Sequence, residues 1–249
     1  MKLKITIPEG LKDIKLYQYQ KFAEIEEKIE DANTLAIQMV HIFCNVEIEK
    51  VRLLNIQDVF SIGDTIGAFF NEKPPLINRF SMNGIQYGFI PKLDEMTFGE
   101  YVDIDTYLSD WQNMQYAMAV LYRPVEGSYK DMYNIRPYKT NDEAKMLEMP
   151  MDVVLGALLF FLSFRERLLE NYSELFTGET GEQFSQVYQF GKKYGWFSSL
   201  YGLTQGDIRR LESITELNLH TCLHWLQFEK EKNEIESNKI KRMYDKNRR

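Results

Sequence analysis

Phe80-Ser81-Met82-Asn83-Gly84-Ile85-Gln86-Tyr87-Gly88-Phe89 is the stretch that decides the fold class. Its Asn-Gly pair tolerates the positive φ angles of a type I′ turn, whose twist suits a two-residue loop between antiparallel strands. On the second strand the alternate residues from Ile85 to Phe89 are apolar, so they share one face. The stretch therefore predicts a β-hairpin within a chain whose other patterns are mostly helical.

The sequence before the hairpin predicts one strand and then helices. Residues Lys2 to Ile7 alternate between polar and apolar, and Pro8 ends this expected strand. Asp13 is the expected N-cap of the first helix. The helices expected from apolar spacing begin near residue 16 and cover residues 34–43 and 56–71.

The sequence after the hairpin is helical with one weakly patterned interval. Thr97 and Glu100 have the spacing of a capping box, and a helix is expected from Asp105 to Leu121. Residues 125–145 are polar and tyrosine-rich, which predicts either a long loop or a small irregular hairpin. Pro150 suits the first turn of a helix that runs to about residue 176.

A second part of the chain is expected after a short polar, glycine-bearing segment. We predict an N-terminal body over residues 1–176, a linker over 177–183 and a C-terminal helical module over 184–249. The module is expected to contain a helix over 184–194, an aromatic turn or short helix over 195–206, a short helix from Asp207 and a final long helix from Asn218. The predicted fold class is mainly α (α+β): a helical body with a small antiparallel β element and a C-terminal helical module that ends in a long helix.

Composition narrows the classes of function. The 249 residues are 44% hydrophobic and 14% aromatic, which is enough for a packed core, and the net charge of −7 disfavours general binding to nucleic acid. The cysteines, Cys44 and Cys222, are too few for a disulfide framework, so reduced thiols are expected. The most apolar run, residues 153–164, is shorter than the roughly twenty residues that cross a bilayer, so no membrane partner is expected.

Motifs for catalysis are weak. His220 and His224 lie four residues apart and could share one metal ion, but Cys222 points elsewhere on the same helix and no third ligand has a suitable spacing. The alternative is a histidine pair without a metal. No nucleophile motif or phosphate-binding loop is present. We therefore expect no enzyme activity, no cofactor and no metal site.

An acidic stretch has two interpretations. Its carboxylates could act in hydrolysis or bind a cation, or they could simply favour a helix N-terminus and a solvated face. We prefer the second interpretation. The members of this stretch are Asp94, Glu95, Glu100, Asp103, Asp105 and Asp110.

The candidate binding residues lie in the C-terminal module. Trp196, Phe197 and Tyr201 crowd a short glycine-bounded segment, and aromatic side chains of this kind anchor protein interfaces. They could instead fill a core or stack bases, although few basic residues lie between them. The basic end of the last helix is expected to touch an acidic partner or nucleic acid, or else to be a solvated end. Its candidate residues are Lys239, Lys241, Arg242, Lys246, Arg248 and Arg249.

Several segments resemble proteins of tailed bacteriophages. The hairpin through Ile90-Pro91, Met96-Thr97-Phe98-Gly99-Glu100-Tyr101-Val102-Asp103, Ala117 to Pro124 and Met149 to Ala157 are similar to a group of phage proteins encoded with virion morphogenesis genes. The segment from Gly195-Trp196-Phe197 to Asp207, with the charged helix after it, is similar in style to the C-terminal parts of phage tail assembly chaperones. The resemblance implies a protein that binds partners and is not an enzyme, and it carries over no catalytic or binding residue.

Three classes of function follow as hypotheses. The first is a phage assembly or structural protein whose partners are other morphogenetic or virion proteins, or further copies of itself. Such a protein would be either a chaperone in the host cytoplasm or a connector, ring or internal (cargo) component of the virion. The second is a metal-dependent hydrolase, and the third is a nucleic-acid-associated protein that uses its basic tail. We prefer the first, and no small-molecule substrate is expected.

Overall fold

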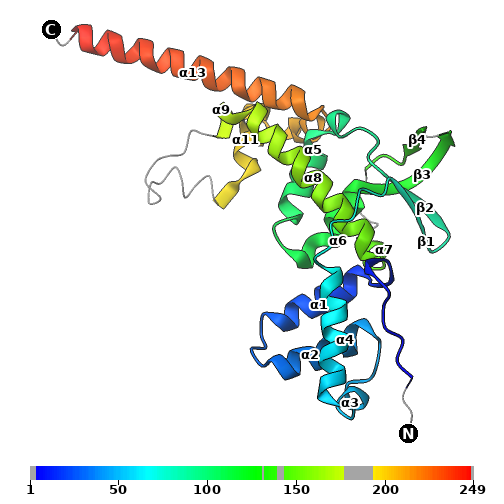
Figure 1. The fold of residues 1–249 in the computed structure, drawn as a ribbon. Coiled ribbons are helices and arrows are strands. Elements are labelled where there is room, and N and C mark those ends of the chain that lie inside the picture. The colour runs from blue at the N-terminus through cyan, green and yellow to red at the C-terminus, as the bar shows by residue number, and fades with distance from the viewer. Residues whose placement is uncertain (1–3, 131, 139–142, 177–192, 248–249) are drawn as a thin grey trace. The chain divides into compact units, whose positions relative to one another are not determined.

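A computed structural model describes residues 4–130, 132–138, 143–176 and 193–247 (Figure 1). The chain divides into two compact units, one made of residues 1–91 and 104–162 and the other of residues 92–103 and 163–249. This division differs from the predicted body and module. The predicted linker and the helix expected over 184–194 lie largely outside the described residues, so they stay predictions.

Short helices form the start of the first unit. They are α1 (Leu16–Glu26), α2 (Ala32–Phe43), α3 (Ile48–Val51) and α4 (Ile56–Phe69). Aromatic rings join them: Phe43 lies 5.3 Å from Phe22 and 5.7 Å from Phe70, measured between ring centroids. The helices expected here are confirmed. Asp13 is not the N-cap of α1, because its carboxylate accepts a hydrogen bond from the Glu9 amide, whereas Gln18 caps the amide of Lys15.

The predicted hairpin is confirmed and is part of a larger sheet. The antiparallel strands are β1 (Arg79–Met82), β2 (Ile85–Phe89), β3 (Tyr122–Tyr129) and β4 (Met132–Ile135), in the order β1-β2-β3-β4. Asn83 and Gly84 have φ angles of 51° and 76°, as a type I′ turn requires. Of the two interpretations left open for residues 125–145, the hairpin is therefore correct for the β3–β4 part.

The strand expected over Lys2 to Ile7 is wrong for residues 4–7. These residues have no strand partner among the described residues, and Ile7 is 38% exposed. The alternation of apolar residues was real, but a strand also needs a neighbouring edge to receive its hydrogen bonds.

The helix expected from Asp105 to Leu121 is interrupted. The structure has α5 (Phe98–Tyr107) and α6 (Met114–Leu121), with a 3₁₀ turn over Trp111–Asn113 between them. Asp110 caps that turn, because its carboxylate accepts a hydrogen bond from the amide of Gln112. The capping box is confirmed: the Glu100 carboxylate lies 2.8 Å from the Thr97 amide, and the Thr97 hydroxyl lies 3.2 Å from the Glu100 amide.

The remaining α-helices among the described residues are α7 (Glu143–Met146), α8 (Met151–Asn171), α9 (Ser173–Phe176), α11 (Trp196–Thr204), α12 (Leu211–Thr215) and α13 (Leu219–Asn247). The predicted fold class, mainly α with a small antiparallel sheet and a long C-terminal helix, is confirmed. Among the described residues, none of the helices combines the length and the apolar character that a bilayer crossing requires.

Candidate partner-binding surface

Helix α11 begins at a glycine because of its backbone geometry. Gly195 has φ 48° and ψ −127°, a conformation that residues with a Cβ rarely adopt. The turn brings Trp196 to the first position of the helix. The short helix that the sequence allowed over 195–206 is therefore present.

Trp196 is half-buried and packs against the core of the second unit. Its ring lies edge-on to Phe98 and Tyr101, with centroid distances of 5.7 and 5.5 Å and interplanar angles of 87° and 86°. Both partners are fully buried. Of the three aromatic candidates, Trp196 is thus the one that holds α11 against the start of α5.

Phe197 and Tyr201 are directed to solvent. They lie four residues apart on one face of α11, and 55% and 63% of their surfaces are exposed. On another face, Gly202 approaches α13, since a Cβ added there would lie 3.9 Å from Leu226. One side of α11 is therefore docked, and the other presents two aromatic rings.

A tight turn joins α11 to the next helical residues. Gln205 and Gly206 have positive φ angles of 55° and 77°, and the Gly206 amide donates to the Tyr201 carbonyl. Asp207 then caps the 3₁₀ turn Ile208–Arg210 that leads into α12, as expected. The hydrogen bond from the Arg209 guanidinium holds the pKa of Asp207 below its usual value.

The beginning of α13 is anchored within the second unit. The Asn218 side chain accepts hydrogen bonds from the amides of His220 and Thr221, so the predicted helix start is confirmed. The Leu219 amide donates to the Met96 carbonyl, and the Leu217 carbonyl accepts from the Phe98 amide. Leu219, Cys222 and Leu223 are buried.

The histidine pair of α13 shares one tyrosine. The Tyr172 oxygen lies 2.9 Å from Nδ1 of His220 and 3.2 Å from Nδ1 of His224. The His224 Nδ1 also lies 2.8 Å from the His220 carbonyl, so this nitrogen must carry a hydrogen. The Tyr172 hydroxyl therefore accepts from His224, the direction of its hydrogen bond with His220 follows the His220 tautomer, and burial raises the pKa of Tyr172.

One carboxylate also lies close to the histidine pair. His220 Nε2 lies 3.5 Å from the Asp94 carboxylate, and the carboxylate is well exposed. The described residues contain no group of three or more histidine, cysteine or acidic side chains that could hold a metal ion. The acidic stretch is dispersed: Glu95 pairs with Lys92, Glu100 belongs to the capping box, and Asp110 caps the turn after α5.

The anchoring of α13 ends near Lys230. Gln227 donates to the Glu174 carboxylate, and the Lys230 ammonium donates to the Glu174 carbonyl of α9. From residue 231 to residue 246 every residue is exposed, including Ile235, Ile240, Met243 and Tyr244. Figure 1 shows this part of α13 in orange to red, continuing past α9 and α11.

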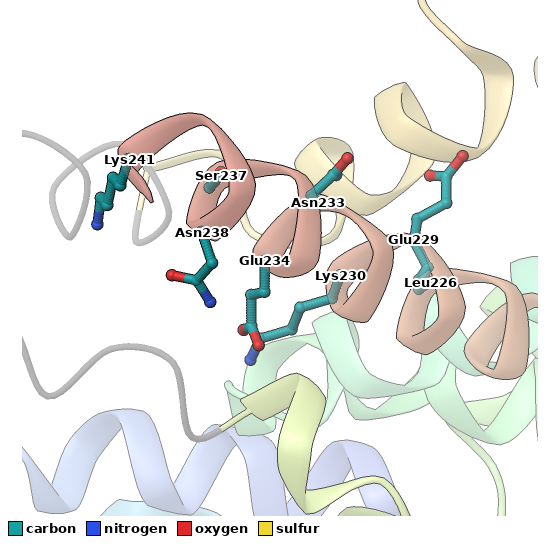
Figure 2. Close-up of a pocket in the computed structure, with 8 residues that line it drawn as sticks. All are labelled: Leu226, Glu229, Lys230, Asn233, Glu234, Ser237, Asn238 and Lys241. Atoms are coloured by element: carbon teal, nitrogen blue, oxygen red, sulfur yellow. The ribbon is translucent and has the colours of Figure 1, made fainter. Parts of the chain in front are cut away.

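Two open depressions lie on different faces of α13. Figure 2 shows the first, whose described lining residues all belong to this helix: Leu226, Glu229, Lys230, Asn233, Glu234, Ser237, Asn238 and Lys241. The second is lined by Phe228, Glu231, Lys232, Ile235, Glu236 and Lys239. The lining residues of each depression follow one side of a single helix, and they include charged side chains. Such a surface is better suited to contact a second helix than to bind a small ligand.

The basic candidates occupy the far half of the exposed helix. Lys239, Lys241, Arg242 and Lys246 are all exposed, while Arg248 and Arg249 lie outside the described residues. Residues 229–236 carry four acidic and two basic side chains, and residues 237–246 carry four basic and one acidic. The exposed helix is therefore polarised, with an acidic near half and a basic far half.

Sequence reasoning missed two exposed aromatic residues. Trp225 and Phe228 lie just before the continuously exposed part of α13, with 51% and 60% of their surfaces exposed. The sequence did contain a sign of this surface. Phe228 and Ile235 are seven residues apart, so these two apolar side chains lie on the same side of the helix. The link of Tyr172 to the histidines had no signal in the sequence, because 48 residues separate it from His220.

Comparisons of the chain with protein-family models, curated proteins and solved structures found no match.

Proposed function

We propose that the chain is a non-enzymatic bacteriophage assembly protein that acts through protein–protein contacts, in the manner of a tail assembly chaperone. The phage context comes from the sequence resemblance. The contact-forming role is supported by one observation: neighbouring helices α11 and α13 present Phe197, Tyr201, Trp225 and Phe228, each more than half exposed. Exposed aromatic rings of this kind are the usual anchors of protein interfaces.

The experiment that tests this role removes three of the four rings and leaves the fold intact. The triple variant Phe197→Ser, Tyr201→Ser, Phe228→Ser changes exposed side chains only, so its melting temperature should match that of the parent chain. In cells that are assembling virions, a tagged parent chain should co-purify with morphogenetic proteins. The triple variant should recover at least about tenfold less of them, since one or two lost anchors cost 1.4 kcal/mol or more.

A matched control lies in the first unit. Leu53 is 86% exposed, so Leu53→Ser removes a comparable apolar side chain from a different surface. It should leave the recovery of partners unchanged. Equal recovery by the parent chain and the triple variant would refute the role of the α11 and α13 aromatics.

A virion component is the first alternative within the same class. A connector, ring or internal (cargo) protein would use the same exposed rings but would remain in the particle, whereas a chaperone would stay in the host cytoplasm. Quantitative mass spectrometry of purified virions separates the two, because a component is present at a fixed copy number per particle and a chaperone is absent.

Nucleic-acid association is the second alternative, and the basic far half of α13 favours it. The acidic near half of the same helix and the net charge of −7 oppose it. Its test is binding to duplex DNA, which should weaken steeply with salt and disappear in Lys239→Glu, Lys241→Glu, Arg242→Glu if the basic residues are responsible.

A further inference from the structure

We infer that residues 228–246 of α13, which are exposed throughout beyond Lys230, pair with the same segment of a second copy of this chain in an antiparallel arrangement. This inference rests on the proposed contact-forming role and names one partner for it. Three features of α13 support this pairing: the order of charges along the helix, its exposed apolar residues and its exposure beyond Lys230.

The charge order is complementary to itself when one copy is reversed. Glu231, Glu234 and Glu236 precede Lys239, Lys241 and Arg242, and all six are exposed. In an antiparallel pair the acidic half of each copy faces the basic half of the other, and a twofold axis passes near Ser237 and Asn238. A parallel pair would instead place acid against acid and base against base, which is repulsive.

Apolar side chains lie on the side of the helix that such a pair would bury. At 100° per residue, Phe228, Ile235 and Met243 fall within an arc of about 80°. Each has more than half of its surface exposed. Lys232 and Lys239 share this arc, and their alkyl stems can cover apolar surface while their ammonium groups reach acidic side chains.

An unpaired helix of this composition has little to hold it. Residues 231–246 receive intrahelical support of the kind given by Lys232 and Glu236, whose charged atoms are 4.0 Å apart. Such exposed pairs contribute about 0.3–0.5 kcal/mol each. Pairing with a second copy would bury the apolar arc and place Lys239 of each copy opposite Glu236 of the other, while Glu234 and Lys241, on the opposite side of the helix, interact at longer range.

The experiment compares the full-length chain with charge-reversed variants by sedimentation velocity at low salt. The all-acidic variant is Lys239→Glu, Lys241→Glu, Arg242→Glu, and the all-basic variant is Glu231→Lys, Glu234→Lys, Glu236→Lys. The parent chain should dimerise, with a dissociation constant that rises at least about tenfold from 50 to 500 mM salt. Each variant alone should be monomeric, and an equimolar mixture of the two should form a one-to-one dimer.

A third variant tests the direction of the pair. Reversing all six residues in one chain restores self-complementarity only if the copies are antiparallel. This variant should dimerise with itself and not with the parent chain, whereas parallel copies would give the opposite result. The control Lys4→Glu, Lys21→Glu, Lys73→Glu makes the same charge change at exposed positions of the first unit and should leave the dimer intact.

Three results would overturn the inference: a parent chain that stays monomeric at about 100 µM, an all-acidic variant that still dimerises, or a mixture that stays monomeric. A monomeric parent chain that still captures morphogenetic proteins through its exposed rings refutes self-pairing and leaves the proposed function standing. A monomeric parent chain that binds duplex DNA through Lys239, Lys241 and Arg242 refutes self-pairing and shows that the basic half of α13 binds nucleic acid instead.

Discussion

The indole of Trp196 stands edge-on to the phenol ring of Tyr101, with 5.5 Å between ring centroids and 86° between ring planes. Tyr101 is fully buried, whereas the next residue after Trp196, Phe197, is 55% exposed. These adjacent aromatic residues of α11 therefore differ in their contacts. Trp196 packs within the second unit and stabilises it, whereas Phe197 is exposed and available to a partner.

This difference predicts opposite outcomes for two alanine substitutions. Trp196→Ala should lower the free energy of unfolding by about 2–4 kcal/mol, because it leaves a cavity beside Phe98 and Tyr101. Phe197→Ala should change it by less than about 0.5 kcal/mol. Thermal and urea unfolding of both variants measure the contrast, and equal stabilities would show that Trp196 does not pack as described.

Tyr172→Phe tests the hydrogen bonds of the histidine pair. The substitution removes the hydroxyl shared by His220 and His224 and should cost about 1 kcal/mol, because both imidazoles lose a hydrogen-bond partner. The matched control is Tyr244→Phe, at a position that is 72% exposed and should be neutral. A Tyr172→Phe chain as stable as its parent would contradict this geometry.

Gly156 and Gly63 both lie in helices, but only Gly156 is in close contact with the backbone of another segment. A Cβ at Gly156 would lie 2.4 Å from the Pro75 carbonyl oxygen, whereas one at Gly63 would make an ordinary 3.7 Å contact with Met39. Gly156→Ala should therefore destabilise the chain by about 1–3 kcal/mol. Gly63→Ala should be neutral or stabilising by up to about 1 kcal/mol, because alanine favours helix. Unfolding curves showing the reverse order would refute the contact at Pro75.

The two thiols should react slowly in the folded chain. Burial raises the pKa of both Cys44 and Cys222 to about 11. At pH 8 a thiol-specific reagent should modify them at least about a hundredfold more slowly in the native chain than in denaturant, where the thiol pKa is about 8.5. An introduced exposed thiol, Ser237→Cys, should react rapidly and serves as the control.

The same pKa shift predicts a loss of stability at alkaline pH. The thiols stay protonated in the folded chain, so their contribution is complete below about pH 8.5, where the unfolded thiols are protonated too. It is lost as pH rises from about 8.5 towards 11, since the unfolded thiols ionise first. Replacing both cysteines with alanine should flatten this part of the stability profile, and an unchanged slope would contradict the assignment.

The sequence predicted the elements that local chemistry determines. The Asn83-Gly84 turn, the Thr97–Glu100 capping box and the helix start at Asn218 each need only a few neighbouring residues, and all three are present. The strand expected before Pro8 failed because its formation depends on a distant partner. The helix break at Asp110 was also missed, since the apolar spacing continues across it.

The candidate surface was predicted in part. Phe197, Tyr201 and the described basic residues of α13 are exposed, but the partial burial of Trp196 depends on Phe98 and Tyr101, which are distant in sequence. Because Trp196 packs on Phe98 and Tyr101, a truncation that removes residues 184–249 would also expose the start of α5. A cut after Lys230 is the truncation that removes the exposed helix alone.

The most direct test of the account is cross-linking mass spectrometry of the full-length chain in cells that are assembling virions, with a lysine-reactive reagent. The account predicts that intermolecular cross-links concentrate on Lys232, Lys239, Lys241 and Lys246 of α13, to other morphogenetic proteins and to a second copy of the chain. Exposed lysines of the first unit, such as Lys21 and Lys73, provide the internal comparison. Intermolecular cross-links that map to the first unit and leave the α13 lysines unlinked would contradict it.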